Sequence, residues 1–194
     1  MRRFRRVCVY CGSSNDVSEA YLRAARELGV LLAGRGIGVV FGGGRVGLMG
    51  ALADGALAAG GEVLGVIPEK LQSLELGHLG LTELFVVDSM HARKTMMAHL
   101  SDAFVALPGG WGTLEEIFEV TTWTQLNYHH KPVGLLNVDG YYDRLLEFLA
   151  HAASEGFVRP AHRNLMQSSS DPAALLEAMA VVEIPELGRW IVKP

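Results

Sequence analysis

Short apolar runs alternate along this chain with longer segments in which apolar residues recur every three or four positions. The short runs are typical of buried strands, and the longer spacing is typical of helices with one buried face. The pattern predicts strands at 5–11, 37–42, 62–67, 83–87, 103–107 and 132–137. It predicts helices near 17–34, 46–59, 89–101, 113–126 and 140–155. A last helix is expected after Asp171-Pro172, because aspartate favours the N-cap and proline the first helical position.

The alternation of strands and helices implies parallel strands joined by right-handed crossovers. The strands are apolar almost throughout, as expected when helices cover both faces of a sheet. One buried face of the first helix is predicted at Leu22, Ala25, Leu28, Leu31 and Leu32. The predicted fold class is therefore α/β, a single-domain doubly wound parallel sheet of Rossmann-like type. Residues 1–180 are expected to form that domain, and 181–194 a poorly patterned C-terminal extension.

Glycine clusters mark the place where a ligand is expected. In doubly wound folds, ligands bind beyond the carboxyl ends of the strands, near the point where the strand order reverses. The first strand is followed by Gly12-Ser13-Ser14, the second by Gly42-Gly43-Gly44 and the fifth by Pro108-Gly109-Gly110. Residues 68–82 form the one long irregular connection, so this segment is expected to line the site.

Composition and charge exclude several classes of protein. The chain has 23 glycines and a net charge of −4, and it shows no basic face typical of a nucleic-acid-binding protein. The four arginines between residues 2 and 6 are interpreted as the charged end of the first strand, with a targeting signal as the alternative. No apolar run is as long as a membrane span, and the run 7–11 is too short for a signal peptide. A cytoplasmic protein is expected.

Cys8 and Cys11 have the C-x-x-C spacing of a redox motif. That motif lies in a loop at a helix N-terminus, whereas these cysteines lie in a predicted buried strand. Residues three apart on a strand point to opposite faces of the sheet. Two buried thiols without redox chemistry are therefore predicted.

The segment from Gly42 to Gly47 contains a literal G-x-G-x-x-G, the fingerprint of a dinucleotide site. It follows the second strand rather than the first, and the next strand ends in Pro68 instead of an acidic residue that would bind a ribose. Glycines that let the backbone approach a phosphate or ribose are the preferred interpretation. A tight turn without a ligand is the alternative.

A more specific motif runs from Pro108 to Glu116, with the sequence Pro-Gly-Gly-Trp-Gly-Thr-Leu-Glu-Glu. It follows an apolar strand and opens a helix whose inner stripe is predicted at Leu114, Ile117, Phe118 and Thr121. Free backbone N–H groups, the helix dipole and the hydroxyl of Thr113 make this helix start suitable for a phosphate. The dipole is expected to favour the ionised form of Glu116. Glu115 is either a site residue or only a first-turn charge that favours the helix.

Arg93 and Lys94 lie near the start of another predicted helix, within Met90-His91-Ala92-Arg93-Lys94. Two cations at a helix start are unfavourable to the dipole, so a bound phosphate or a carboxylate partner would compensate. A solvated basic face is the alternative. The seven histidines show no metal-ligand spacing, so no metal site is expected. No Gly-x-Ser-x-Gly motif or Cys/His pairing suggests a covalent nucleophile.

Taken together, the Met90–Lys94 and Pro108–Glu116 motifs resemble the signature of the Lonely Guy family, the cytokinin riboside 5′-monophosphate phosphoribohydrolases. The resemblance covers most of the chain. It begins at Cys11-Gly12-Ser13-Ser14, continues through Phe41-Gly42-Gly43-Gly44 and Gly47-Leu48-Met49-Gly50, and ends near residues 131–137 and Gly140-Tyr141-Tyr142.

This resemblance implies hydrolysis of the N-glycosidic bond of N6-modified adenosine 5′-monophosphates, with plain AMP left open as a substrate. It also implies a homodimer and no cofactor. Members are often labelled lysine decarboxylases, although nothing in this sequence indicates pyridoxal phosphate chemistry. Carried over residue by residue, Arg93 and Glu116 are the catalytic pair. The nucleotide contacts implied are Glu75, Arg93, Lys94, Gly109, Gly110, Trp111, Gly112, Thr113, Leu114, Glu115 and Thr122. Ser14, Gly43 and Gly44 join this candidate set from the loops after the first two strands.

Two other functions remain open. A nucleotide-binding or molybdenum-cofactor carrier protein resembles this fold and binds without hydrolysis, although the presence of both Arg93 and Glu116 argues against it. An NAD-dependent oxidoreductase is disfavoured because the acidic residue after the third strand is missing.

Overall fold

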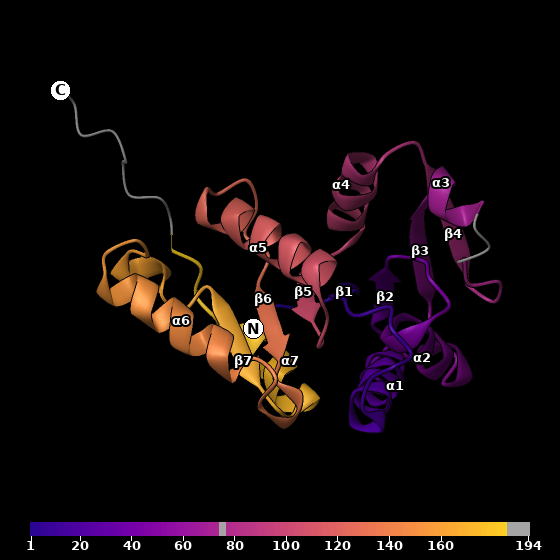
Figure 1. Cartoon of the computed structure of the whole chain (residues 1–194), viewed down its shortest axis with the longest axis horizontal. Coiled ribbons are helices and arrows are strands. Elements are labelled where there is room, and N and C mark those ends of the chain that lie inside the picture. Colours follow the sequence, from indigo (N-terminus) through magenta and orange to yellow (C-terminus); the bar gives the residue numbers. More distant parts are fainter. Residues whose placement is uncertain (74–76, 186–194) are drawn as a thin grey trace.

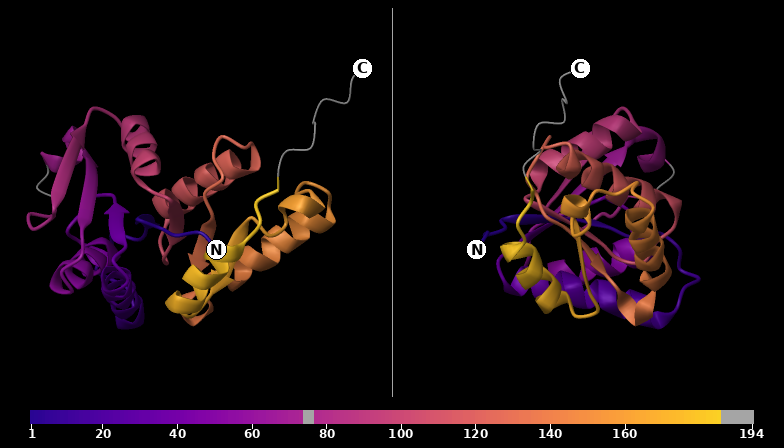
Figure 2. Two further views of the ribbon diagram at one scale, coloured as in Figure 1. Left: turned by 180° about the vertical axis from the view of Figure 1, so that it is seen from behind. Right: turned by 90° about the vertical axis from the view of Figure 1, so that its left-hand side faces the viewer.

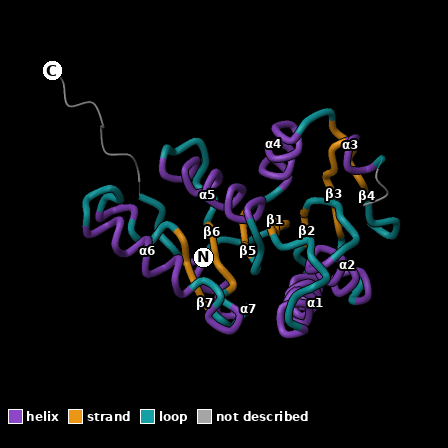
Figure 3. Tube along the Cα trace, in the orientation of Figure 1, coloured by secondary structure: helices purple, strands orange, loops and turns teal. Residues whose placement is uncertain are grey.

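The structure is a computed structural model that describes residues 1–73 and 77–185. Across these residues the chain forms a seven-stranded parallel sheet with the strand order β4-β3-β2-β1-β5-β6-β7. The strands are β1 (Arg6–Tyr10), β2 (Gly38–Phe41), β3 (Val63–Pro68), β4 (Glu83–Val87), β5 (Ala103–Ala106), β6 (Val133–Leu136) and β7 (Met166–Ser169). Strands and helices alternate along the trace (Figure 3), which confirms the predicted α/β class.

Helices cover both faces of the sheet. They are α1 (Glu19–Gly34), α2 (Gly47–Ala58), α3 (Glu69–Gln72), α4 (Met90–Leu100), α5 (Trp111–Gln125), α6 (Asp143–Ser154) and α7 (Pro172–Val181), with 3-10 turns η1 (Val138–Gly140) and η2 (Pro160–His162). Figures 1 and 2 show α1 and α2 on one side of the strands and α4 and α5 on the other. Each face has its own apolar cluster, so the sheet is buried on both sides. No helix in the described part of the chain is long and apolar enough to cross a membrane.

All six predicted strands are present, each within about two residues of its predicted bounds. Strand β7 was not predicted because its residues, Met166–Ser169, are mostly polar and lie at the edge of the sheet. Helix α3 is a single turn inside the connection 68–82, which was expected to be irregular. The division of the chain at residue 180 stays a prediction. Helix α7 ends at Val181, and residues 186–194 lie outside the described residues.

The buried face of α1 is close to the predicted one: Ala25, Leu28 and Leu32 are fully buried, and Leu22 and Leu31 pack partly against them. The predicted stripe of α5 is partly wrong. Its buried residues are Thr113, Glu116, Ile117, Val120 and Thr124. Leu114 and Phe118 are only partly buried. The buried face of α5 therefore includes Glu116, which the predicted stripe did not. The reason is that the start of α5 packs against the carboxyl ends of the central strands.

The two cysteines lie on opposite faces of the sheet, as predicted. Cys8 is fully buried in the cluster that contains Phe104, and Cys11 packs partly against the cluster that contains Phe41. Burial raises the pKa of Cys8 to about 12 and raises that of Cys11 as well. High thiol pKa values disfavour the reactive thiolate. The prediction of burial is confirmed for Cys8 but is wrong for Cys11, which is only partly buried because it follows the end of β1. The expectation that neither thiol has redox chemistry stays a prediction.

The strand order reverses between β1 and β5. These strands pair directly, with Tyr10 opposite Ala106, and the chain leaves them toward opposite faces. The loops beyond them also touch, since the Gly12 N–H donates to the Pro108 carbonyl at 3.0 Å. A side chain at Gly109 would clash with Thr113 and with the backbone of Gly12. The predicted ligand position and the glycine clusters therefore coincide at this point.

Candidate active site

A cavity of about 570 Å³ opens beyond the carboxyl ends of β1, β2, β3 and β5. Its walls come from the loops after these strands and from the starts of α2, α4 and α5. The lining residues are Cys11, Gly12, Ser13, Gly42, Gly44, Val46, Met49, Ile67, Leu71, Met90, Arg93, Gly110, Trp111, Gly112, Thr113, Glu115 and Glu116. The volume is within the range of small-molecule sites.

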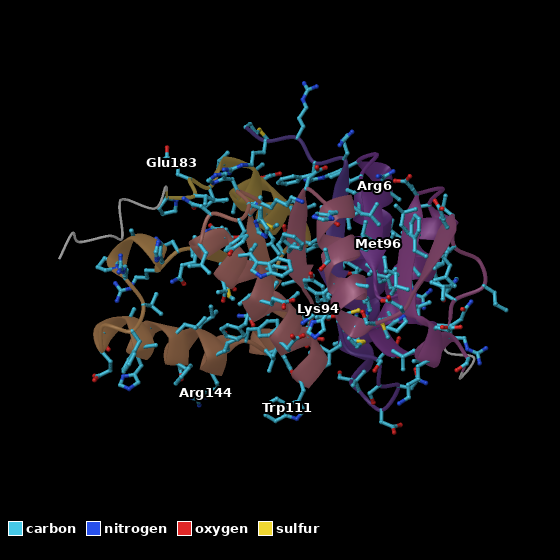
Figure 4. The ribbon with its side chains drawn as sticks, turned by 90° about the horizontal axis from the view of Figure 1, so that it is seen from above. Arg6, Lys94, Met96, Trp111, Arg144 and Glu183 are labelled. Carbon is cyan, nitrogen blue, oxygen red and sulfur yellow. The ribbon has the colours of Figure 1, made fainter. Side chains whose placement is uncertain are left out.

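The start of α5 forms one wall of this cavity. Helix α5 begins at Trp111, two residues earlier than predicted. Its N-cap is Gly110, which has no side chain that could cap the helix. The first-turn N–H groups are therefore not capped by a side chain, and the positive end of the helix dipole faces the cavity. Thr113 is buried at this point, while Trp111 is 91% exposed and points away from the ribbon in Figure 4. The wall suits an anion such as a phosphate.

Arg93 of α4 and Glu116 of α5 meet at the cavity. Arg93 Nη2 lies 3.4 Å from Glu116 Oε1, and the two side chains are 11% and 8% exposed. The guanidinium lies against the backbone of Gly42, at the end of β2. A Cβ at that position would clash with Arg93 Nη2. Only a residue without a side chain leaves this space, so the loop after β2 helps to place the cation beside the carboxylate.

Burial raises the pKa of Glu116 to about 7, although Arg93 opposes this rise and Glu115 adds to it. The expectation that the helix dipole would favour the ionised carboxylate is therefore wrong for this residue. The desolvation of a nearly buried carboxylate outweighs the effect of the neighbouring cation. A carboxyl group with this pKa can exchange a proton near neutral pH.

Lys94 does not border the cavity. Its ammonium bonds to Glu115 and, at 3.0 Å, to Glu119 Oε1, and Figure 4 shows it between α4 and α5. Burial opposes its charge, but the two carboxylates outweigh burial and raise its pKa. The N-terminus of α4 is capped by the Ser89 hydroxyl, which accepts from the Ala92 N–H at 3.1 Å. Carboxylate partners therefore compensate the two cations. The sequence had left open such a partner, a bound phosphate or a solvated basic face.

The remaining candidate residues take several positions. Gly44 borders the cavity, whereas Gly43 lies behind it with a φ of +75° and its carbonyl accepts from the His78 N–H at 2.9 Å. The Ser14 hydroxyl accepts from the Asp16 N–H at 3.1 Å. Thr122 is exposed on α5, and its hydroxyl donates to the Phe118 carbonyl at 2.8 Å. Neither Ser14 nor Thr122 borders the cavity, and neither do Gly109 and Leu114. Glu75 lies outside the described residues, and the predicted ligand contacts of all these residues stay predictions.

The connection 68–82 borders the site in part, as expected. Leu71 of α3 lines the cavity, and the connection is joined to the glycine loop by the bridge between Gly44 and Gly77. The His78 ring bonds to Asp54 of α2 at 3.1 Å. These contacts hold the wall against the end of β2.

The motifs did not predict an apolar wall made by Met49, Ile67 and Leu71, together with Met90. These residues come from α2, β3, α3 and α4, so only the fold brings them together. Two tyrosines whose role the sequence did not predict hold the loop after β5. The Tyr142 hydroxyl donates to the Leu107 carbonyl at 2.6 Å, and the Tyr141 hydroxyl donates to the Gly109 carbonyl at 2.7 Å.

Comparison with known proteins identifies the family. A family model described as "Possible lysine decarboxylase" matches residues 49–179. The chain is 52% identical over 177 residues to the "Probable cytokinin riboside 5'-monophosphate phosphoribohydrolase LOGL9" of Oryza sativa subsp. japonica, covering 91% of this chain and 78% of the relative. It is 48% identical over 177 residues to the "Cytokinin riboside 5'-monophosphate phosphoribohydrolase LOG5" of Arabidopsis thaliana, covering 91% and 78%. The chain belongs to the phosphoribohydrolase family that the resemblance indicated.

Solved structures similar to this phosphoribohydrolase family member include two described as binding or carrying the molybdenum cofactor. The carrier protein from Chlamydomonas reinhardtii matches with a TM-score of 0.69 and 25% identity, over 91% of this chain and 96% of the carrier. The binding protein from Rippkaea orientalis matches with a TM-score of 0.69 and 26% identity, over 91% and 96%. The fold is therefore shared between named hydrolases and named carriers, so the site has to decide between these functions.

Proposed function

We propose that this chain hydrolyses the N-glycosidic bond of adenosine 5′-monophosphates that carry an N6 substituent, releasing the free base and ribose 5-phosphate. One observation carries the proposal: the Arg93–Glu116 pair and the uncapped start of α5 border the same cavity. The first supplies groups for the reaction and the second supplies a phosphate site. The names of relatives about half identical to the chain agree with this activity.

The phosphate is proposed to bind at the N-terminus of α5. Gly110 and Gly112 leave room at the first turn, since a Cβ at either position would meet nothing within 4 Å. The backbone N–H groups there have no side-chain cap, and the dipole favours an anion. A bound phosphate at this wall fixes the distance between the sugar and the groups on the facing helix.

Glu116 is proposed to act on the sugar and on water. Cleavage of the glycosidic bond passes through an oxocarbenium-like transition state with positive charge on the ribose. A carboxylate beside the ribose stabilises that charge, and it can accept a proton from the water that attacks C1′. The bond from C1′ to the base nitrogen breaks, and its electron pair leaves with the base. The base then takes up the proton that Glu116 accepted from water, directly or through solvent, so the free base is neutral and Glu116 is ionised again. With a pKa of about 7, Glu116 is available in the ionised form that this role needs.

Arg93 is proposed to position the substrate rather than to donate a proton, because a guanidinium stays protonated in proteins. It lies against Gly42 and beside Glu116. From there its charge can hold a phosphate or ribose oxygen, or steady the departing base. Its positive charge also opposes the effect of burial on Glu116.

The apolar wall supports a substituted base. Met49, Ile67 and Leu71 come from the β2–β3 side of the cavity, whereas the proposed phosphate site comes from the β5 side. A nucleotide that places its phosphate at α5 extends its base toward the apolar side. An apolar N6 substituent would be buried there and would favour binding by a few kcal/mol.

The same cavity could hold a cofactor for a carrier protein, and the similarity to molybdenum-cofactor carriers supports this second candidate function. A carrier does not need a carboxyl group with a pKa near neutrality beside an arginine, so the hydrolase is preferred. We further propose that the enzyme is cytoplasmic, that it acts as a homodimer and that the hydrolysis needs no cofactor.

Product analysis tests the proposal. The protein is incubated with N6-isopentenyladenosine 5′-monophosphate, and the products are separated by chromatography with mass detection. The proposal expects equal amounts of N6-isopentenyladenine and ribose 5-phosphate. Release of the nucleoside and inorganic phosphate would indicate a phosphatase, and binding without turnover would favour the carrier. A parallel incubation with AMP measures the contribution of the N6 substituent.

A further inference from the structure

Two adjacent residues of α4 contact carboxylates of α5. Arg93 faces Glu116 at 3.4 Å, and Lys94 faces Glu119 at 3.0 Å. Glu116 and Glu119 are separated by about one helical turn. The two ion pairs therefore join the same helices side by side, and only the first borders the cavity.

Among the described residues, the side chain of Glu119 forms a hydrogen bond with Lys94 alone. One of its oxygens accepts from the Lys94 ammonium, and the other, Oε2, is buried without a hydrogen-bond partner among the residues that the structure describes. A buried carboxylate oxygen without a partner costs stability. Removing the charge of Glu119 would therefore remove this desolvation cost, yet the protein has a glutamate at this position.

Lys94 needs a partner that stays in place. Its side chain is 9% exposed, so its charge would be costly if left unpaired. Its other partner, Glu115, is 55% exposed and borders the cavity, and the family resemblance implies that it contacts the nucleotide. Glu119 is 27% exposed and lies away from the cavity. Glu119 is therefore the partner that can hold Lys94 in both the free and the occupied site.

We propose that Glu119 is a positioning residue for the reaction: through Lys94 it holds α4 against α5 so that Arg93 stays beside Glu116, and its negative charge acts on Glu116. This inference rests on the proposed function. It assigns Glu119, which does not touch the cavity, a role in both the geometry and the electrostatics of the catalytic pair.

The charged and titratable groups that face Glu116 come from three elements. They are Arg93 and Lys94 of α4, Glu115 and Glu119 of α5, and Cys8, Tyr10 and Cys11 from β1 and the loop after it. Burial raises the pKa values of the three groups at β1, so they are neutral near pH 7. The carboxylates of Glu115 and Glu119 favour the protonated form of Glu116, and the two cations favour its ionised form.

These signs fix the expected result for E119Q. The substitution keeps the shape of the side chain and removes one negative charge, so Glu116 should ionise at lower pH. If catalysis needs ionised Glu116, the acidic limb of the kcat profile moves to lower pH by roughly 0.5 or more. The weakened hold on Lys94 also disturbs the Arg93–Glu116 geometry, so kcat at its plateau should fall by about 10-fold to 100-fold while KM changes little. Movement of Arg93 away from Glu116 raises the pKa of Glu116 and so opposes the shift of the limb. K94M is therefore measured beside E119Q, because the lost cation and a displaced Arg93 both raise that pKa.

The experiment measures kcat and KM for N6-isopentenyladenosine 5′-monophosphate from pH 5 to 9 in the wild type, E119Q, K94M and two controls. E147Q is the matched control, because Glu147 forms an exposed pair with Arg144 at 2.8 Å and neither residue lines the cavity. E116Q is the second control, and it tests the proposed function separately. The substrate phosphate titrates near pH 6 in every sample, so only differences between variants report on the protein.

A lower kcat together with a limb at lower pH in E119Q, and neither change in E147Q, supports the proposal. A lower kcat with an unmoved limb in both E119Q and K94M means that Glu119 and Lys94 only support the fold, and the proposal is wrong. A profile equal to that of the wild type also overturns it, provided that E116Q is inactive. If E116Q retains activity, the proposed function itself has failed. In K94M a limb moved to higher pH is the expected result and an unmoved limb is the contradiction, and this variant decides alone if E119Q does not fold.

Discussion

The guanidinium of Arg93 lies 3.4 Å from the carboxylate of Glu116, and little of either side chain is exposed. Burial disfavours the carboxylate and the cation favours it, and the balance sets the pKa of Glu116 to about 7. An exposed glutamate would be fully ionised at neutral pH and would be a weaker base. The pair therefore combines a permanent cation with a group that can exchange a proton under the same conditions.

Replacing Glu116 by glutamine should remove turnover but not binding. The substitution keeps the shape of the side chain and removes the group that accepts a proton and stabilises the charged sugar. We expect kcat to fall by roughly two to four orders of magnitude, the range for a positioned acid–base group. Nucleotide affinity should change by only a few-fold. Steady-state kinetics and calorimetric titration measure both quantities, and near-normal turnover would remove Glu116 from the mechanism.

The same variant should change how stability depends on pH. The folded-state pKa of Glu116, about 7, is raised above that of an unfolded chain. The folded state therefore binds this proton more tightly, and the stabilisation is lost as the pH rises through about 7. Glutamine cannot ionise. The free energy of unfolding of E116Q relative to that of the wild type should therefore be higher at pH 8 than at pH 5, by an amount on the order of 1–3 kcal/mol.

Denaturant unfolding at the two pH values measures this difference. If the difference in stability between E116Q and the wild type is the same at pH 5 and pH 8, Glu116 has an ordinary pKa. E147Q is a suitable control, because Glu147 is exposed on α6.

The sequence predicted the strands and most helices because their apolar spacing is regular and their glycine loops are local signals. It did not predict β7, whose polar residues at a sheet edge carry no such spacing. The Gly42–Arg93 contact joins residues that are distant in the sequence, and only the pairing of β1 with β2 and the crossing of α4 bring them together. The apolar wall around Met49 and Leu71 was missed for the same reason.

The helix start after β5 was predicted better than the ionisation of Glu116. The motif from Gly109 to Thr113 is contiguous, so its position at a helix start follows from local sequence. The pKa of Glu116 depends on how much protein surrounds it, which local sequence does not contain. The local sequence showed only the helix dipole, which favours the ionised carboxylate, whereas burial in the folded protein raises the pKa of Glu116.

Gly42 should be sensitive to the smallest enlargement. In G42A the new methyl group would clash with Arg93 Nη2, so the guanidinium must move away from Glu116. We expect kcat/KM to fall by about 10-fold to 100-fold, because small misplacements of catalytic groups have effects of this size. G34A is the matched control, since a Cβ at Gly34 would meet nothing within 4 Å. Equal activity of the two variants would contradict the role given to Gly42.

Thr113 should discriminate between ligands with and without a phosphate. T113V keeps the volume of this buried side chain and removes one polar group from the proposed phosphate site. It should weaken binding of nucleoside monophosphates by about 10-fold, and it should affect free nucleosides much less. T121V on the same helix is the control, because the Thr121 hydroxyl donates only to the Ile117 carbonyl, at 2.7 Å. Equal weakening of both ligand types would mean that the phosphate lies elsewhere.

The most direct test of the proposed function compares N6-isopentenyladenosine with its 5′-monophosphate. If the α5 start holds the phosphate, binding at this remote group positions the glycosidic bond against Glu116, and its absence lowers both affinity and turnover. Each charge-assisted hydrogen bond to the phosphate contributes roughly 1.5–3 kcal/mol, so losing two or three should lower kcat/KM by about 10³-fold or more. The measurement is the rate of base release from both compounds under identical conditions. Rates for the nucleoside at least about 10³-fold lower agree with a nucleotide hydrolase, and rates within tenfold of each other would contradict it.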